Sequence, residues 1–162
     1  MMHVSFLTYH LFNQKSIITM TPRQIQLVKN SWAIVSTLDI ITVGSLFYNR
    51  LFEIDPETKP MFSVTVEEQA RKAMSMLNYI IQKLDKLDDI VDEVTKLAQA
   101  HAKYGVGPEH YLTGGVALLW TLEKGLGKHW NEEVREAWVS CYTVLSNAMI
   151  ESAYGTPLAE VA

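Results

Sequence analysis

Apolar residues recur every three or four positions along most of this chain, which is the spacing of one face of an α-helix. The first repeat covers residues 22–37, with Ile25, Val28, Trp32 and Val35 in register. The same spacing predicts further helices over residues 40–53, 66–84, 94–101, 109–126 and 131–154. No segment shows the alternation of apolar and polar residues that is typical of a strand. The pattern therefore predicts an all-α chain of six or seven helices with short connections.

Proline and glycine mark the breaks between these helices. Pro56 and Pro60 predict a short, tight connection, and residues 104–108, with two glycines and a proline, end the fourth helix. The acidic residues 85–92 lack the spacing of a calcium loop and are expected to form a charged turn. Gly44 lies on the inner face of its helix, where a missing side chain lets another helix cross closely. These features favour crossing helices over a parallel bundle.

Length and composition indicate a single globular domain. The chain has 162 residues, of which 48% are hydrophobic, and a net charge of −4. It has no basic excess that would attract nucleic acid and no apolar run of the roughly 20 residues that span a bilayer. The single cysteine, Cys141, excludes an intrachain disulfide and fits a cytoplasmic location. It falls in register with apolar helix residues, which is typical of an inert buried thiol.

The first 19 residues differ from the rest. They are apolar and aromatic, but they lack the basic start and the small-residue cleavage site of a signal peptide. Thr21 followed by Pro22 is typical of a helix cap and a first helical residue, so a fresh element begins there. We expect an N-terminal extension over 1–19, a domain over 20–155 and a tail over 156–162. The extension is expected to be disordered or packed on a partner.

His101 is the strongest candidate for chemistry. It lies at the end of a short helix, in line with Val94, Leu97 and Ala98, so its ring is expected to point inward. A lone histidine does not hold bare zinc, which normally takes four ligands. It can hold an iron whose in-plane ligands come from a porphyrin. The alternative is a histidine that simply packs in the core.

Three segments in order resemble the globin family, specifically bacterial single-domain globins and the haemoglobin domain of flavohaemoglobins. They are residues 46–62 (LFYNRLF, a proline, then KPMF), 69–74 (QARKAM) and 101–111 (HAKYGV to EHY). The final helix, with AWVSCY at 137–142, has the same character, and the resemblance covers about residues 21–154. It implies a globin fold, which is a three-over-three helical sandwich, and haem b (iron protoporphyrin IX) as the cofactor.

The resemblance also implies roles for individual residues. His101 takes the place of the iron ligand, with its other ring nitrogen donating to a backbone carbonyl near Leu97. Tyr48 and Gln69 take the distal positions, where an O–H and an N–H donate to O2. Phe62 takes the place of the aromatic that wedges the porphyrin. The cofactor-binding positions carried over are Phe62, Gln69, Lys72, Ala73, Leu97, His101, Tyr104, Val106 and Tyr111.

A purely structural role remains the alternative for several of these side chains. Tyr48 and Phe62 also suit a core, and Gln69 also suits an exposed helix face. Arg71 or Lys72 is a candidate partner for a haem propionate, although each also suits a solvated helix face.

Two positions depart from the family pattern. Ala73 stands where a larger aliphatic residue is usual, which leaves more room above an iron. Tyr111 matches a tyrosine that supports the proximal histidine together with a glutamate, and Ala153 stands where that glutamate is expected. Glu151 is two residues away, about 200° around the helix. The full proximal network is therefore in doubt.

We expect a haem protein that binds O2 for transport, storage or sensing, with CO and NO as further ligands. NO detoxification is a second use, and it would need a separate reductase, because the sequence ends at Ala162 without flavin and NAD domains. A monomer or a homodimer is expected. The rival interpretation is a haem-free globin-like module that works in signalling through protein contacts. Enzymatic activity stays open, and the resemblance does not separate a carrier from an NO dioxygenase.

Overall fold

The computed structural model describes residues 19–155, which form six α-helices and three short 3-10 helices. The α-helices are α2 (Pro22–Val35), α3 (Ile40–Ile54), α4 (Val66–Gln82), α5 (Val91–Lys103), α6 (Pro108–Leu126) and α7 (Glu132–Tyr154). The 3-10 helices are η1 (Pro56–Met61), η2 (Leu84–Ile90) and η3 (Gly127–His129). There is no strand among the described residues, so the all-α prediction is confirmed. The predicted extension and tail lie outside the described residues, apart from Thr19.

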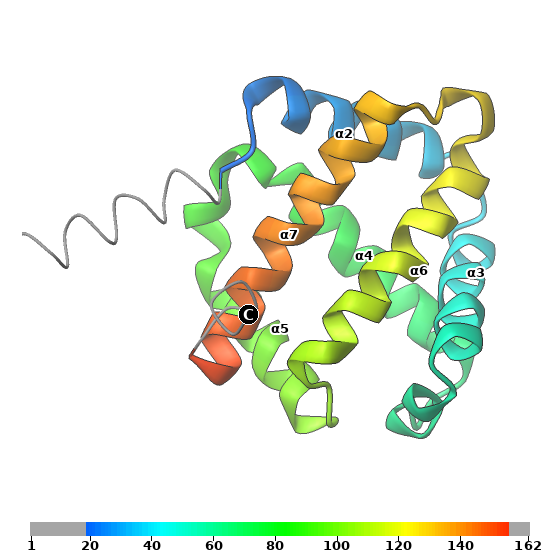
Figure 1. Cartoon of the computed structure of the whole chain (residues 1–162), viewed down its shortest axis with the longest axis vertical. Helices are drawn as coiled ribbons and strands as arrows, with labels where there is room; N and C mark the ends of the chain where they lie inside the picture. The colour runs from blue at the N-terminus through cyan, green and yellow to red at the C-terminus, as the bar shows by residue number, and fades with distance from the viewer. Residues whose placement is uncertain (1–18, 156–162) are drawn as a thin grey trace, which may run out of the picture.

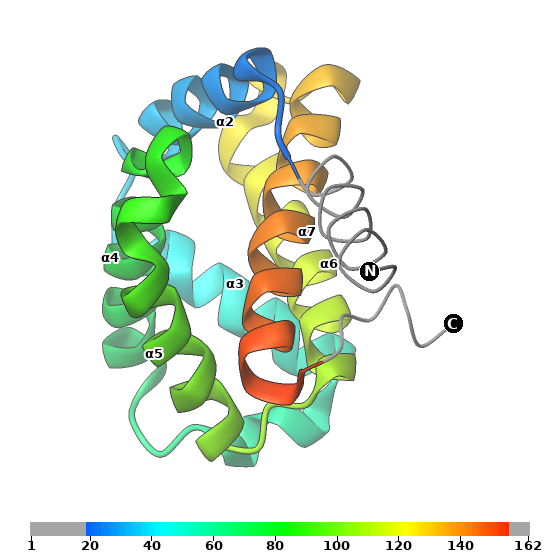
Figure 2. The same ribbon diagram turned by 90° about the vertical axis from the view of Figure 1, so that its left-hand side faces the viewer.

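The helices form two layers of three (Figure 1). One layer holds α2, α4 and α5, and the other holds α3, α6 and α7; Figure 2 shows the layers edge on. The tightest packing between layers joins α3 to α4, α2 to α7 and α5 to α7. This arrangement is the three-over-three sandwich that the sequence predicts.

Local signals in the sequence explain where these helices begin. Thr21 caps α2, because its hydroxyl accepts from the backbone of Gln24 while the Gln24 side chain accepts from the backbone of Thr21. Thr65 and Glu68 make the same reciprocal cap at the start of α4. Each cap satisfies backbone N–H groups that have no partner inside the helix.

Two tryptophans anchor the core between α2 and α7. Trp32 and Trp138 are each no more than 2% exposed, and their ring centres lie 6.2 Å apart. The Trp32 indole donates to the Asn78 side chain at 2.9 Å, and the Trp138 indole donates to the Ser31 hydroxyl at 2.9 Å. Both buried N–H groups are therefore paired, which removes the cost of desolvating them.

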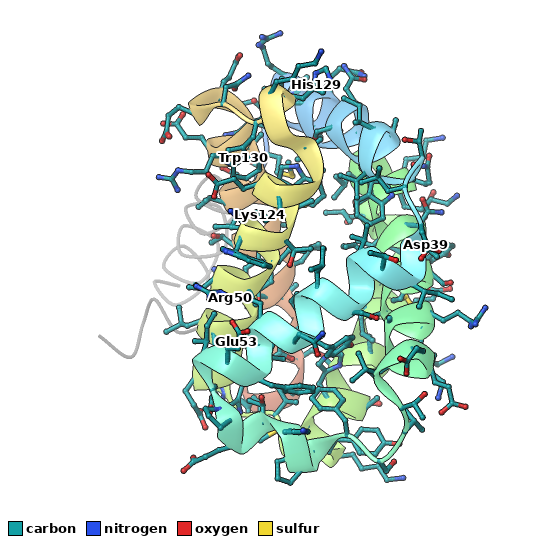
Figure 3. The ribbon with its side chains drawn as sticks, turned by 90° about the vertical axis from the view of Figure 1, so that its right-hand side faces the viewer. Asp39, Arg50, Glu53, Lys124, His129 and Trp130 are labelled. Carbon is teal, nitrogen blue, oxygen red and sulfur yellow. The ribbon has the colours of Figure 1, made fainter. Side chains whose placement is uncertain are left out.

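The crossing of α3 and α6 lies on the side that Figure 3 faces. Arg50 on α3 and Lys124 on α6, both labelled in Figure 3, lie 5.0 Å and 5.7 Å from the centre of the Trp120 ring. Arg50 also pairs with Glu53 one turn later, at 3.1 Å. The half-buried Trp120 indole thus contacts one cation from α3 and one from its own helix, α6.

One local expectation from the sequence differs from the structure. The acidic turn expected over residues 85–92 is the 3-10 helix η2 followed directly by α5, with a break in helical backbone at Lys86. Buried Leu84 and Ile90 hold the ends of η2 and account for this ordered form. The helix expected over residues 109–126 is α6, which continues through Gly125 to Leu126. The break comes at Gly127, whose φ is +51°.

Two neighbouring rows of residues on α4 pack against the core, and one is buried more deeply than the other. The buried residues of α4 are Ala70, Met74, Ile80 and Ile81, whereas Ala73 and Leu77 are half-buried. The close crossing predicted at Gly44 explains why the row of Ala70 is the more deeply buried one. A Cβ atom on Gly44 would lie 2.5 Å from the Cβ of Ala70, so α3 packs directly on the Ala70 row of α4.

No single helix among the described residues is long and apolar enough to cross a membrane. Only α2 and α3 taken together meet the length and composition criteria, and a bend of 110° separates them.

Candidate functional site

His101 lies in the last turn of α5, and its ring is fixed from within the same helix. Its Nδ1 is 2.8 Å from the carbonyl oxygen of Leu97, one turn earlier. Because a carbonyl oxygen can only accept, this bond places the hydrogen of a neutral ring on Nδ1 and leaves a lone pair on Nε2. Nε2 has no hydrogen-bond partner among the described residues. The helix therefore presents one basic imidazole nitrogen in a defined orientation.

Tyr111, near the start of α6, packs on the imidazole of His101. The two rings are stacked, with centres 6.2 Å apart and planes 25° apart. Tyr111 is 6% exposed, and its hydroxyl has no hydrogen-bond partner within residues 19–155. Burial raises the pKa of Tyr111 to about 12, and the neighbouring Tyr154 adds to the shift. The hydroxyl is thus neutral and available as a donor.

The side chains behind Tyr111 contain no carboxylate partner for it. Ala153, where the resemblance leads one to expect a glutamate, packs in an apolar cluster with Ala98, Tyr111 and Ile150. Glu151 is exposed. The unpartnered Tyr111 hydroxyl agrees with the doubt raised from the sequence about a complete proximal network.

Tyr48 and Gln69 meet where α3 packs on α4. Tyr48 on α3 is 5% exposed, and burial raises its pKa above the ordinary value. The Gln69 amide on α4 donates to the Tyr48 hydroxyl at 3.3 Å, a long hydrogen bond. Because Tyr48 accepts here, its own O–H remains free to donate to a third group.

The close crossing of α3 and α4 brings these two side chains together. Gly44 lies one helical turn before Tyr48, and Ala70 is the neighbour of Gln69 in the sequence. Because Gly44 has no side chain, the two helices approach until these backbones are almost in contact. The sequence therefore places a tyrosine and a glutamine at one crossing by means of a glycine.

Aromatic rings surround Tyr48. Its ring centre lies 4.9 Å from that of Phe47, 6.1 Å from Phe52 and 5.2 Å from Phe62. Phe62 follows η1, and its ring is 5.6 Å from Phe52. Edge-to-face contacts of this kind hold the phenol in one orientation.

Two separate apolar clusters frame the site. One contains Tyr48 and Leu51 with Phe62 and Ala73 beside them, and the other contains Ala98 and Tyr111 with Leu97 and Val106 beside them. The clusters share no member among the described residues, and α5 packs on α7 and η2 more than on α4. The remaining candidates lie at the surface, because Lys72 is exposed and Tyr104 is 60% exposed.

One contact near His101 could not be inferred from the sequence. Tyr154, in the last turn of α7, donates from its hydroxyl to the carbonyl oxygen of Val106 at 2.5 Å. Val106 follows the helix of His101, and its own backbone N–H donates to the carbonyl oxygen of His101. The end of α7 therefore holds the loop after α5, although 48 residues separate the two partners.

The described residues offer no cluster of three or more histidine, cysteine or carboxylate side chains that could bind a metal ion directly. A metal at this site would therefore depend on His101 together with ligands from elsewhere.

The Globin family model matches residues 45–149, a span that holds every candidate from Tyr48 to Tyr111. The chain is 27% identical over 138 residues to a neuroglobin from Tetraodon nigroviridis, a match that covers 76% of this chain and 86% of that protein. It is 30% identical over 108 residues to a flavohemoprotein from Vibrio cholerae, with 65% of this chain and 27% of that protein covered. Among solved structures, a bacterial globin from Campylobacter jejuni superimposes with a TM-score of 0.73 at 25% identity. That match covers 83% of this chain and 97% of the other.

Proposed function

The chain belongs to the globin family, and we propose that it binds haem through His101 and serves as a reversible O2-binding protein. The main support for this proposal is the hydrogen bond that fixes the orientation and the protonated nitrogen of the His101 ring. Its Nδ1 is bonded to the Leu97 carbonyl, so Nε2 keeps the lone pair that an iron ligand needs.

The residues present fit a haem group. Two apolar clusters without a common member flank the site, one beside Tyr48 and the other beside His101. Apolar walls with a few oriented polar groups are typical of cofactor sites. We assign Phe62, Ala73, Leu97 and Val106 to the walls. Lys72 and Tyr104 are at the surface, which suits contacts with the polar edge of the group.

Bound haem supplies an iron that takes O2, CO or NO as a reversible ligand. The chain would contribute donors: the free O–H of Tyr48 and the second N–H of the Gln69 amide, whose other N–H is bonded to Tyr48, would donate to a small ligand that gains negative charge. Burial keeps Tyr48 in its protonated, donating form, since it raises the pKa of the phenol. The surrounding aromatic rings shield the Tyr48 ring from water.

We favour reversible binding over oxidative chemistry because of the proximal side. A carboxylate bonded near His101 would increase the electron density that the imidazole gives to iron. Tyr111 has no such partner among the described residues, and Ala153 stands where the resemblance leads one to expect that carboxylate. Removal of NO, which combines O2, NO and one electron to give nitrate, would further require a separate reductase. It is therefore the secondary use, and NO consumption with and without an added reducing system measures it.

The proposal is tested by titrating the haem-free protein with hemin. Wild type is expected to give a red protein with a sharp Soret band, and His101→Ala to lose that band or bind hemin much more weakly. His129→Ala is the matched control, because His129 is exposed in η3 and lies outside the site. A colourless wild-type protein that takes up no hemin would contradict the proposal and support a haem-free module acting through protein contacts.

A further inference from the structure

A groove of about 310 Å³ runs between α7 and the η2–α5 segment. Figure 2 shows the ribbons of α5 and α7, the two helices that flank it. Leu87, Val91 and Val94 line one wall, and Val144, Leu145 and Ala148 line the other. Val91 is 55% exposed, an unusual state for an apolar residue in such a hollow. The groove takes no part in the proposed haem site.

The rim of this groove is acidic. Asp88 from η2 and Glu151 from α7 belong to its lining, and no salt bridge among the described residues engages either one. Asp89 and Asp92 are exposed nearby on the same segment. A groove with apolar walls and carboxylates at its rim is complementary to an apolar segment that carries positive charge and no acidic residue.

We propose that the groove binds residues 1–18 of the same chain. This segment contains no Asp or Glu, and its charged side chain is Lys15. Its apolar side chains are those of Val4, Phe6, Leu7, Tyr9, Leu11, Phe12, Ile17 and Ile18, with the methionines at its start. The segment thus complements both the apolar walls and the acidic rim of the groove. The rest of the chain carries a net negative charge.

The start of α2 lies within reach of the groove. Arg23 pairs with Glu133 at 2.6 Å, and the Gln24 side chain donates to the Ser140 hydroxyl at 3.0 Å, so the beginning of α2 is fixed on α7. Ala148 lies eight residues beyond Ser140 on the same helix, which corresponds to about 12 Å. Eighteen residues span about 27 Å even when fully helical, which is more than the distance needed.

The groove adjoins the helix that carries His101. Val94 lines the groove and also packs against the cluster that contains Ala98 and Tyr111. A segment bound there contacts α5 and restricts its motion relative to α7. Binding of the N-terminal segment therefore links the beginning of the chain to the proximal side of the site.

The test is limited proteolysis of the full-length chain with chymotrypsin, which cuts after Phe6, Tyr9 and Phe12. A synthetic peptide of residues 1–18 gives the rate for an unprotected segment. Wild type is expected to be cut at least about tenfold more slowly than the peptide, since cleavage follows the fraction of undocked segment. Ala148→Arg places a bulky cation in the groove and is expected to restore rapid cleavage. Val116→Arg, on the exposed face of α6, is the matched control and is expected to remain protected.

Circular dichroism verifies that both variants keep their helices. Equal cleavage rates in wild type and Ala148→Arg would overturn the proposal, as would wild-type cleavage as fast as that of the peptide. Protection that appears only at high protein concentration would show that a second copy supplies the segment and would overturn docking within one chain. The measurement needs no haem, so its outcome is independent of the proposed function.

Discussion

Tyr48 is the residue on which stabilisation of a gaseous ligand would depend most. We predict that Tyr48→Phe raises the O2 dissociation rate about 10- to 100-fold, because a hydrogen bond to a charged acceptor contributes ~1.5–3 kcal/mol. Stopped-flow displacement of O2 by CO measures this rate. The CO dissociation rate is expected to change much less, since bound CO carries little negative charge.

Tyr79→Phe is the control for this prediction, because Tyr79 is 39% exposed on α4. An O2 dissociation rate that is the same in Tyr48→Phe and wild type would assign ligand stabilisation to Gln69 alone or to neither residue.

Ala73 is the second residue whose substitution we expect to change ligand binding. It lies beside the cluster of Tyr48 and Phe62 and is half-buried. We predict that Ala73→Leu slows CO and O2 association about fivefold, as expected if the added side chain raises the entry barrier by ~1 kcal/mol. Flash photolysis measures both rates, with Ala33→Leu on the exposed face of α2 as the control. Unchanged association rates would show that Ala73 does not limit access.

The residue types of the site and the bond from the His101 ring to the Leu97 carbonyl could be found in the sequence, but the contacts of Tyr111 and Tyr154 could not. His101, Tyr48 and Gln69 stand at positions that a family pattern marks. The free hydroxyl of Tyr111 and the bond from Tyr154 to Val106 depend on where α7 ends relative to α5, and no local pattern encodes that position. Contacts between residues this far apart require the packed fold.

The crossing of α3 and α4 decides whether the distal pair forms. A Cβ on Gly44 would lie 2.5 Å from the Ala70 Cβ and 2.9 Å from its Cα, so the helix backbones would have to separate. We predict that Gly44→Ala lowers the free energy of unfolding by about 1–3 kcal/mol, the usual cost of overpacking. Urea denaturation measures this change.

Gly125→Ala provides the comparison. Its added Cβ would meet Leu38 and Val35 at 3.6 Å and 3.8 Å, which are ordinary contacts. Because alanine favours a helix over glycine, this variant is expected to gain up to about 1 kcal/mol. Equal effects of the two substitutions would mean that the close approach of α3 to α4 does not matter for stability.

Helix positions were predictable because apolar periodicity and cap residues agree along the chain. Thr21 and Pro22 mark the start of α2 in both the sequence and the structure. The row of α4 that is buried most deeply was not predictable, because rows containing Ala70 and Ala73 are similarly apolar. Only the position of Gly44 on a neighbouring helix selects between them. Likewise, η2 is rich in charge, and its order comes from buried Leu84 and Ile90 rather than from helix propensity.

For the molecule as a whole, the buried ionisable groups predict a loss of stability at alkaline pH. Burial raises the pKa of Cys141 from 9.0 to about 12 and that of Tyr111 from 10.0 to about 12, and it also raises the pKa of Tyr142. Between pH 9 and 12 the unfolded chain releases these protons while the folded chain keeps them. The free energy of unfolding is therefore expected to fall as pH rises through this window. Below about pH 8 both states keep these protons, so these groups do not make stability depend on pH there.

Urea denaturation at pH 7, 9, 10 and 11 measures this dependence. Tyr111→Phe removes one of the titrating groups and is expected to reduce the loss above pH 10. Stability that is unchanged between pH 8 and 11 would contradict the burial of these groups.

The two layers of helices, the fixed imidazole and the distal pair together lead to one central claim, that His101 is the protein ligand of a haem iron. Resonance Raman spectroscopy of the ferrous protein without added gas tests it most directly. Wild type is expected to show an iron–histidine stretching band, His101→Gly to lose it, and added imidazole to restore a band by filling the vacated place. A His101→Gly variant that keeps the wild-type band without imidazole would contradict the claim.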